Sequence, residues 1–103
     1  MMIELKDLQK QAYDNKVKQG FNTTNIEKEF CLTYGELNEA YEAWLKSKDN
    51  LGEELADVMI YLLGMAEILG LDLEKEVLAK LEKNSKRKYK TVNGVKIREE
   101  GCD

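Results

Sequence analysis

The stretch GELNEAYEAWLKSKDNLGEELADV, residues 35–58, decides how this chain folds. It contains two acidic segments, ELNEA at 36–40 and ELADV at 54–58, and each sets two carboxylates three residues apart. Residues with that spacing lie on one face of a helix, one turn from each other. The polar, turn-prone segment KSKDN at 46–50 separates them. The stretch therefore predicts two helices joined by a reversal, each presenting two acids in one direction.

The direction in which these acids point follows from a helical wheel of about 100° per residue. Glu54 and Asp57 fall inside the apolar arc of their helix, and Glu36 is also flanked by apolar residues, whereas Glu39 lies nearer the polar edge. A carboxylate in an apolar interface is costly unless it is paired, protonated or bound to a metal. Clustered acids on two facing helices suit Mg²⁺, which prefers oxygen ligands. The alternative is that the acids are solvated positions on ordinary amphipathic helices.

Composition and periodicity predict an all-α fold. The chain has 103 residues, no proline and few glycines, so we expect one helical domain over residues 1–90. The apolar pattern predicts four helices, near residues 3–18, 25–47, 49–70 and 72–86, that form a four-helix bundle. Residues 91–103, with an Asn93-Gly94 turn, form either a small hairpin or a loose tail.

Two of the predicted helices carry extended apolar surfaces. The second helix has a continuous stripe, which we expect to be core, of Ile26, Phe30, Tyr34, Leu37, Tyr41 and Trp44. In the third helix, Met59, Ile60 and Leu63 lie on the side away from Val58 and Leu62. One small subunit can hardly cover both faces, so we predict at least a homodimer with this helix near the interface.

Charge and hydropathy exclude several classes of partner. The net charge of −4 and the pI near 5.0 argue against a nucleic-acid partner. No apolar run is long enough to cross a membrane and no signal peptide opens the chain, so we expect a cytoplasmic protein with no membrane partner.

Cysteine and histidine usage restricts the chemistry. Cys31 and Cys102 are far apart and outside any Cys-x-x-Cys motif, so neither a disulfide nor a zinc site is expected, and Cys31 is predicted to be buried or half-buried. The chain has no histidine, which excludes histidine-based general base and nucleophile systems. Any catalysis must use carboxylates, lysines, tyrosines or a metal.

Lysines concentrate near two helix ends. Those of the first helix, Lys10, Lys16 and Lys18, are expected in solvent. The cations at the end of the fourth helix are Lys80, Lys83, Lys86, Arg87, Lys88 and Lys90. They either complement the helix dipole or bind phosphate oxygens, and the residues alone leave both open.

The two acidic segments, together with LGLDLE at 69–74 and KLEKNSKRKY at 80–89, resemble the MazG-type all-α nucleotide pyrophosphohydrolases. The resemblance covers most of the chain. It implies a bundle that forms homodimers or homotetramers and uses Mg²⁺, with Mn²⁺ possible, to hydrolyse nucleoside triphosphates to the monophosphate and pyrophosphate. On this resemblance the metal ligands are Glu36, Glu39, Glu54 and Asp57, with Glu36, Glu54 and Asp57 catalytic. The residues implied to bind substrate phosphates are Lys80, Asn84, Arg87 and Tyr89, and aromatics near Trp44 are weaker candidates for the nucleoside.

The sequence departs from that family at one point. The family's acidic signature is commonly Glu-Glu-x-x-Glu, and here Leu32 and Thr33 occupy the positions of its first two acids. Glu39 then serves as the compensating ligand, with Glu29 as a further helper. The alternatives are a non-catalytic oligomerisation or regulatory module that has lost activity through Thr33, and a phosphohydrolase for another pyrophosphate-containing molecule.

Overall fold

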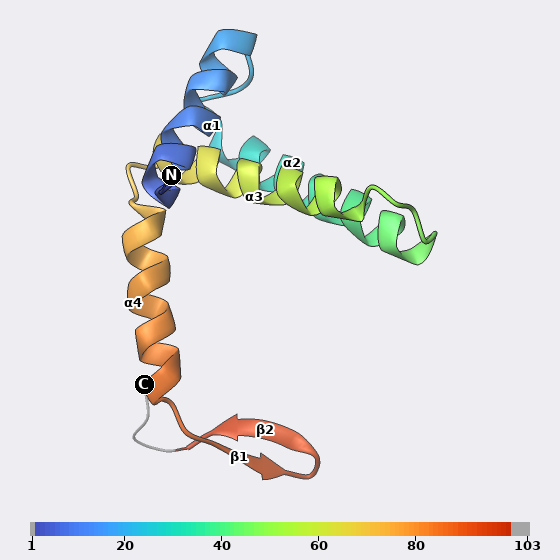
Figure 1. The fold of residues 1–103 in the computed structure, drawn as a ribbon, viewed down its shortest axis with the longest axis vertical. Helices are drawn as coiled ribbons and strands as arrows, with labels where there is room; N and C mark the ends of the chain where they lie inside the picture. Colours follow the sequence, from blue (N-terminus) through green and yellow to red (C-terminus); the bar gives the residue numbers. More distant parts are fainter. Residues whose placement is uncertain (1, 100–103) are drawn as a thin grey trace. The chain divides into compact units, whose positions relative to one another are not determined.

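The computed structural model describes residues 2–99 and contains four helices in that range. They are α1 (Leu5–Gln19), α2 (Ile26–Leu45), α3 (Leu51–Ile68) and α4 (Leu73–Lys86). Two short strands follow, β1 (Tyr89–Val92) and β2 (Val95–Arg98) (Figure 1). The predicted all-α class with four helices is confirmed, and each predicted helix lies within a few residues of its observed bounds.

The helix ends form where the sequence supplies suitable capping residues. Gly20 ends α1 in the left-handed conformation, with φ 73°, which costs a glycine little. Asn25 precedes α2, and its side-chain oxygen accepts a hydrogen bond of 3.1 Å from the backbone N–H of Lys28. These two caps fix where the connection between α1 and α2 begins and ends.

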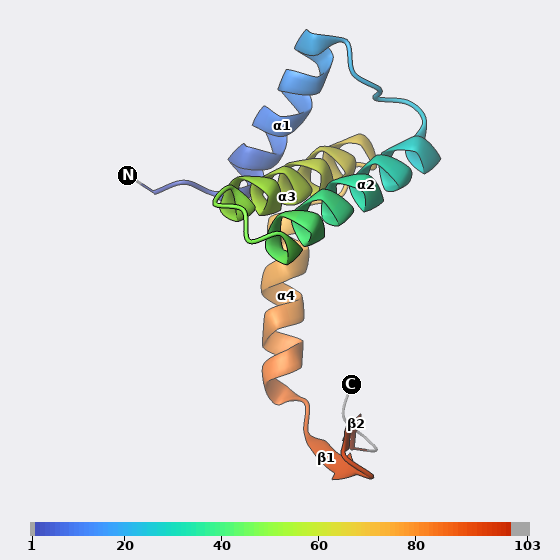
Figure 2. The ribbon, with the colours of Figure 1, turned by 90° about the vertical axis from the view of Figure 1, so that its right-hand side faces the viewer.

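Intrachain contacts group the chain into two units, residues 1–73 and residues 74–103. In the first unit, α3 packs against both α1 and α2, and α2 and α3 run alongside each other in both views (Figures 1 and 2). The prediction of a single domain over residues 1–90 stays a prediction.

The core of the first unit is built from alanines of α2 and apolar residues of α3. Ala40 and Ala43 are buried on α2, and Leu63, Met65 and Ala66 are buried on α3. The predicted core stripe of α2 is wrong within one subunit, because Tyr34, Leu37, Tyr41 and Trp44 are each more than half exposed. The alanine face packs on α3 instead, since small side chains let two helices approach closely.

A buried glutamine of α1 forms hydrogen bonds with the segment that follows α3. Gln9 of α1 is 3 % exposed. Its side-chain amide donates to the backbone oxygen of Leu71 at 2.6 Å and to Glu67 Oε1 at 3.3 Å, and its oxygen accepts from the backbone N–H of Leu73 at 3.1 Å. These bonds satisfy polar groups at the end of α3 and the start of α4 that would otherwise lack partners.

The second unit holds α4 and an antiparallel β-hairpin. Strand β1 pairs with β2 so that Tyr89 faces Arg98 and Val92 faces Val95. Asn93 and Gly94 form the turn with φ 51° and 79°, as a two-residue hairpin turn requires. Of the two alternatives for the end of the chain, the hairpin is therefore found, and it begins at residue 89.

The two cysteines and the hydropathy of the helices complete the comparison with the sequence predictions. Cys31 is exposed, so the expectation of burial is wrong: it lies on the outer side of α2, away from the alanine face. Cys102 lies outside the described residues. Within the described range, no helix combines the length and the hydropathy needed to cross a membrane.

Candidate metal centre

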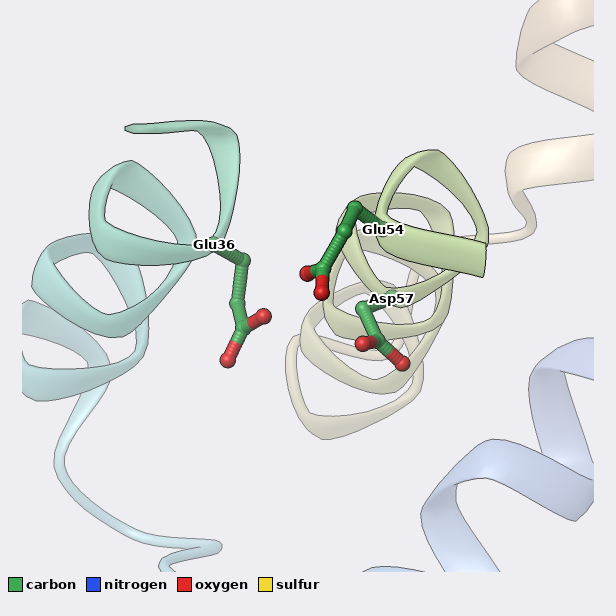
Figure 3. A group of neighbouring side chains, drawn as sticks. All are labelled: Glu36, Glu54 and Asp57. Atoms are coloured by element: carbon green, nitrogen blue, oxygen red, sulfur yellow. The ribbon is translucent and has the colours of Figure 1, made fainter. Parts of the chain in front are cut away.

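The packing of α2 on α3 brings three of the predicted acids together. Glu36 projects from α2 toward Glu54 and Asp57, which project from α3 one turn apart (Figure 3). One carboxylate oxygen from each lies within 4.8 Å of the others. The spacing of three residues places both acids of α3 on the face that meets α2.

These carboxylates sit in a site that disfavours negative charge. Glu36 and Glu54 are half-buried. Burial raises the pKa of Glu36 above its ordinary 4.5, and the charges of Glu39, Asp57 and Glu54 raise it further. The field of the site therefore opposes ionisation of Glu36 and favours any cation that enters.

The hydrogen bonding around Glu54 is incomplete. The side-chain amide of Asn50 donates to Glu54 Oε1 at 3.2 Å. The other carboxylate oxygen, Oε2, is buried and has no hydrogen-bond partner among the described residues, and the same is true of Asn50 Oδ1. Buried oxygens without donors are costly, and a hard divalent cation accepts ligands of this kind. The donor set therefore fits Mg²⁺ or Mn²⁺.

Glu39, the fourth predicted acid, lies beside the three that converge. Glu39 follows Glu36 by one turn of α2, and its charge contributes to the raised pKa of Glu36. It is exposed and is not one of the three acids whose oxygens meet within 4.8 Å. Its place is at the rim of the site, next to Glu36.

Thr33 and Glu29 do not replace the missing acid. The Thr33 hydroxyl donates to the backbone oxygen of Glu29 at 2.7 Å, so it is satisfied within its own helix. Glu29 is completely buried, forms an ion pair with Lys16 and accepts from the side chain of Asn22 at 2.9 Å. Glu29 thus serves the junction of α1 and α2 and is not part of the acid group.

Lys16 is a residue that the sequence prediction placed wrongly. It is only 6 % exposed, because its ammonium pairs with Glu29 and lies 4.8 Å from the centre of the Tyr61 ring. A Cβ on Gly64 would lie 2.8 Å from Lys16 Cε, so the lysine stem passes where α3 has no side chain. The glycine in the middle of an otherwise apolar helix was the available signal.

Tyr61 follows Asp57 by one turn of α3, and its ring lies beside the Lys16 ammonium. Burial raises the pKa of the Tyr61 hydroxyl, and so do the charges of Glu36, Glu29 and Asp57. The phenol therefore keeps its proton and remains a hydrogen-bond donor. No motif pointed to Tyr61, because a tyrosine in an apolar arc is normally read as core.

The four predicted phosphate ligands all belong to the second unit. Lys80 and Asn84 lie one turn apart on α4, Arg87 follows the last residue of that helix, and Tyr89 opens β1. Arg87 Nη1 donates to Asn84 Oδ1 at 2.9 Å. The acid group is formed entirely by the first unit.

Comparison with known proteins identifies a family. Residues 24–103 match the MazG-like family, and this range includes both acidic segments, α4 and the hairpin. No curated protein and no solved structure matches the chain.

Proposed function

We propose that this chain, which belongs to the MazG-like family, is a Mg²⁺-dependent nucleoside triphosphate pyrophosphohydrolase. It would convert a ribo- or deoxyribonucleoside triphosphate and water into the monophosphate and pyrophosphate. The observation that carries the proposal is the convergence of Glu36, Glu54 and Asp57, with a buried oxygen of Glu54 left without a donor. Family membership supports the reaction class, and the acid group supports the metal.

In this proposal the converging acidic side chains bind the metal ion. Glu36, Glu54 and Asp57 hold the ion, with Glu39 as the fourth ligand at the rim, and Mn²⁺ is an alternative to Mg²⁺. When bound, the ion supplies positive charge to phosphate oxygens and makes nearby water more acidic.

The substrate's phosphate chain would be bound by Lys80, Asn84, Arg87 and Tyr89. Arg87 is already oriented by its hydrogen bond to Asn84, so it loses less side-chain freedom on binding an anion. We place the reaction in the cytoplasm.

We further propose that the enzyme is a homodimer or homotetramer. Tyr41 and Trp44 are more than half exposed, and with Leu37, Leu51 and Leu55 they border an apolar hollow between α2 and α3. Contiguous apolar surface of this kind is uncommon on a monomer. A second copy would cover the stripe of α2 that one subunit leaves open.

The test is release of pyrophosphate from a panel of ribo- and deoxyribonucleoside triphosphates with Mg²⁺, Mn²⁺ or EDTA. We expect release that requires the metal and is abolished by Asp57→Asn. The exposed Glu53→Gln, which neutralises an acid of the same helix outside the converging group, should leave it unchanged. Folded protein that releases no pyrophosphate from any nucleotide would refute the proposal and favour a non-catalytic module marked by Thr33.

A further inference from the structure

The two faces of the hairpin differ in chemistry. Cross-strand partners project to the same face, and successive residues alternate between faces. The pairs Tyr89 with Arg98 and Thr91 with Lys96 therefore share one face. The opposite face carries Lys90, Val92, Val95 and Ile97. One face is thus cationic with an aromatic ring, and the other is mainly apolar with a single lysine.

The cationic face continues the charge of α4. The pKa of Lys80 is lowered, chiefly by the charge of Arg87, then by some desolvation and by the charges of Lys83 and Arg98. The strand register sets Arg98 opposite Tyr89, which follows Arg87 by two residues, and the backbone N–H of Glu99 donates to the backbone oxygen of Lys88 at 2.8 Å. Arg98 therefore lies near the end of α4, although it is far from Lys80 in sequence. The end of the helix and the hairpin together concentrate positive charge in the second unit.

The described part of this unit holds more cations than acids, and one of those acids, Glu99, follows Arg98 directly. Glu82 is the only acidic residue between positions 80 and 98, and it pairs with Lys86 at 3.1 Å. Lys80, Arg87 and Arg98 form no ion pair among residues 2–99. Arg87 Nε is also buried and has no hydrogen-bond partner in that range. Three neighbouring cations, one with an unused donor, are arranged to receive an anion with several charges.

We infer that Arg98 joins Lys80 and Arg87 in a binding site for an oligophosphate chain, so that the hairpin supplies a substrate-binding residue. This inference rests on the proposed function in naming the triphosphate of a nucleotide as the ligand. One guanidinium group can bind two phosphate oxygens through two of its N–H groups, which suits Arg87 and Arg98 to a phosphate chain. Tyr89, opposite Arg98, borders the same face.

The test uses inorganic tripolyphosphate in EDTA, so that binding does not depend on the acid group or on a nucleoside. Calorimetric titration should show binding by the whole chain that Arg98→Gln weakens about tenfold or more, as expected for the loss of a charged hydrogen bond. The matched control is Lys90→Gln, which removes the same charge from the same hairpin but from its opposite face. It should weaken binding less than about twofold, as expected for a screened surface charge.

Three outcomes would overturn the inference: no binding of tripolyphosphate, equal losses in the two variants, or tighter binding of a single-stranded oligonucleotide than of tripolyphosphate. Arg98→Lys separates charge from geometry and should retain only part of the affinity.

The result is distinguishable from that of the proposed function. Binding of tripolyphosphate that requires Arg98, in a chain that releases no pyrophosphate, would leave the inference standing and refute the enzyme. Pyrophosphate release with a KM unchanged by Arg98→Gln would do the reverse.

Discussion

Replacing Glu36 by glutamine should stabilise the metal-free protein. Glu36 is the acid that α2 contributes opposite two acids of α3, and the three oxygens lie within 4.8 Å of one another. Two unit charges 4.8 Å apart repel by about 0.9 kcal/mol in water and by about 3.5 kcal/mol at an effective dielectric constant of about 20. The substitution removes the repulsions with Glu54 and Asp57 and keeps a side chain of nearly the same size.

The expected gain is smaller than the sum of those repulsions. The site is only half-buried, so solvent and salt screen the charges. After that discount we expect the free energy of unfolding to rise by about 1–2 kcal/mol, and each 1 kcal/mol corresponds to roughly 4–8 °C in Tm for a domain of this size.

The assay is thermal and urea unfolding in EDTA at low salt, with Glu42→Gln as the control. Glu42 is exposed on the same helix and is not one of the converging acids, so its substitution should change Tm little. Added Mg²⁺ should reduce the difference, because it stabilises the wild type more than Glu36→Gln. A Glu36→Gln protein no more stable than wild type in EDTA would refute the reasoning that the acids repel one another.

Four further predictions follow from the same geometry. Because the folded pKa of Glu36 lies above its ordinary 4.5, the extra stability of Glu36→Gln in EDTA should be full at neutral pH and shrink as pH falls through that raised pKa, which paired melting curves at several pH values would show. Lys16→Ala should cost about 3–5 kcal/mol in urea unfolding, because it leaves the buried Glu29 without its cation, and the double variant Lys16→Met/Glu29→Leu should recover most of that loss. Gln9→Leu should cost about 1–3 kcal/mol by the same measurement, because Leu71 O and Leu73 N–H lose their partners. Thr33→Glu should strengthen Mn²⁺ binding about tenfold and lower the metal-free Tm, because it adds a carboxylate one turn before Glu36.

Much of the helical architecture was predictable because it depends on local chemistry. Gly20 and Asn25 mark helix ends through their own backbone and side-chain preferences, and neither needs a tertiary partner. The convergence of Glu36 with Glu54 and Asp57 was also predictable, since a spacing of three residues and a short reversal place acids of both helices on facing surfaces.

The predictions that were wrong concern which element of the fold packs against a given helix face. Lys16 was expected in solvent, and it is buried because Glu29 and Gly64 come from other helices and supply a charge and a gap. The aromatic stripe of α2 was expected in the core, and Ala40 and Ala43 took that place because they pack more closely on α3. The periodicity of apolar residues shows which side chains share one face of a helix. Which element packs against that face depends on contacts between residues that are distant in sequence.

The most direct test of the account is the binding of Mn²⁺ by the wild-type protein and by Glu36→Gln, measured by electron paramagnetic resonance as the loss of free-ion signal. If these acids form a metal centre, the wild type binds Mn²⁺, and the loss of one of three convergent carboxylates weakens that binding about tenfold or more. The exposed Glu42→Gln should bind as the wild type does. Equal Mn²⁺ affinity in all three proteins would contradict the claim that Glu36, Glu54 and Asp57 form a metal centre.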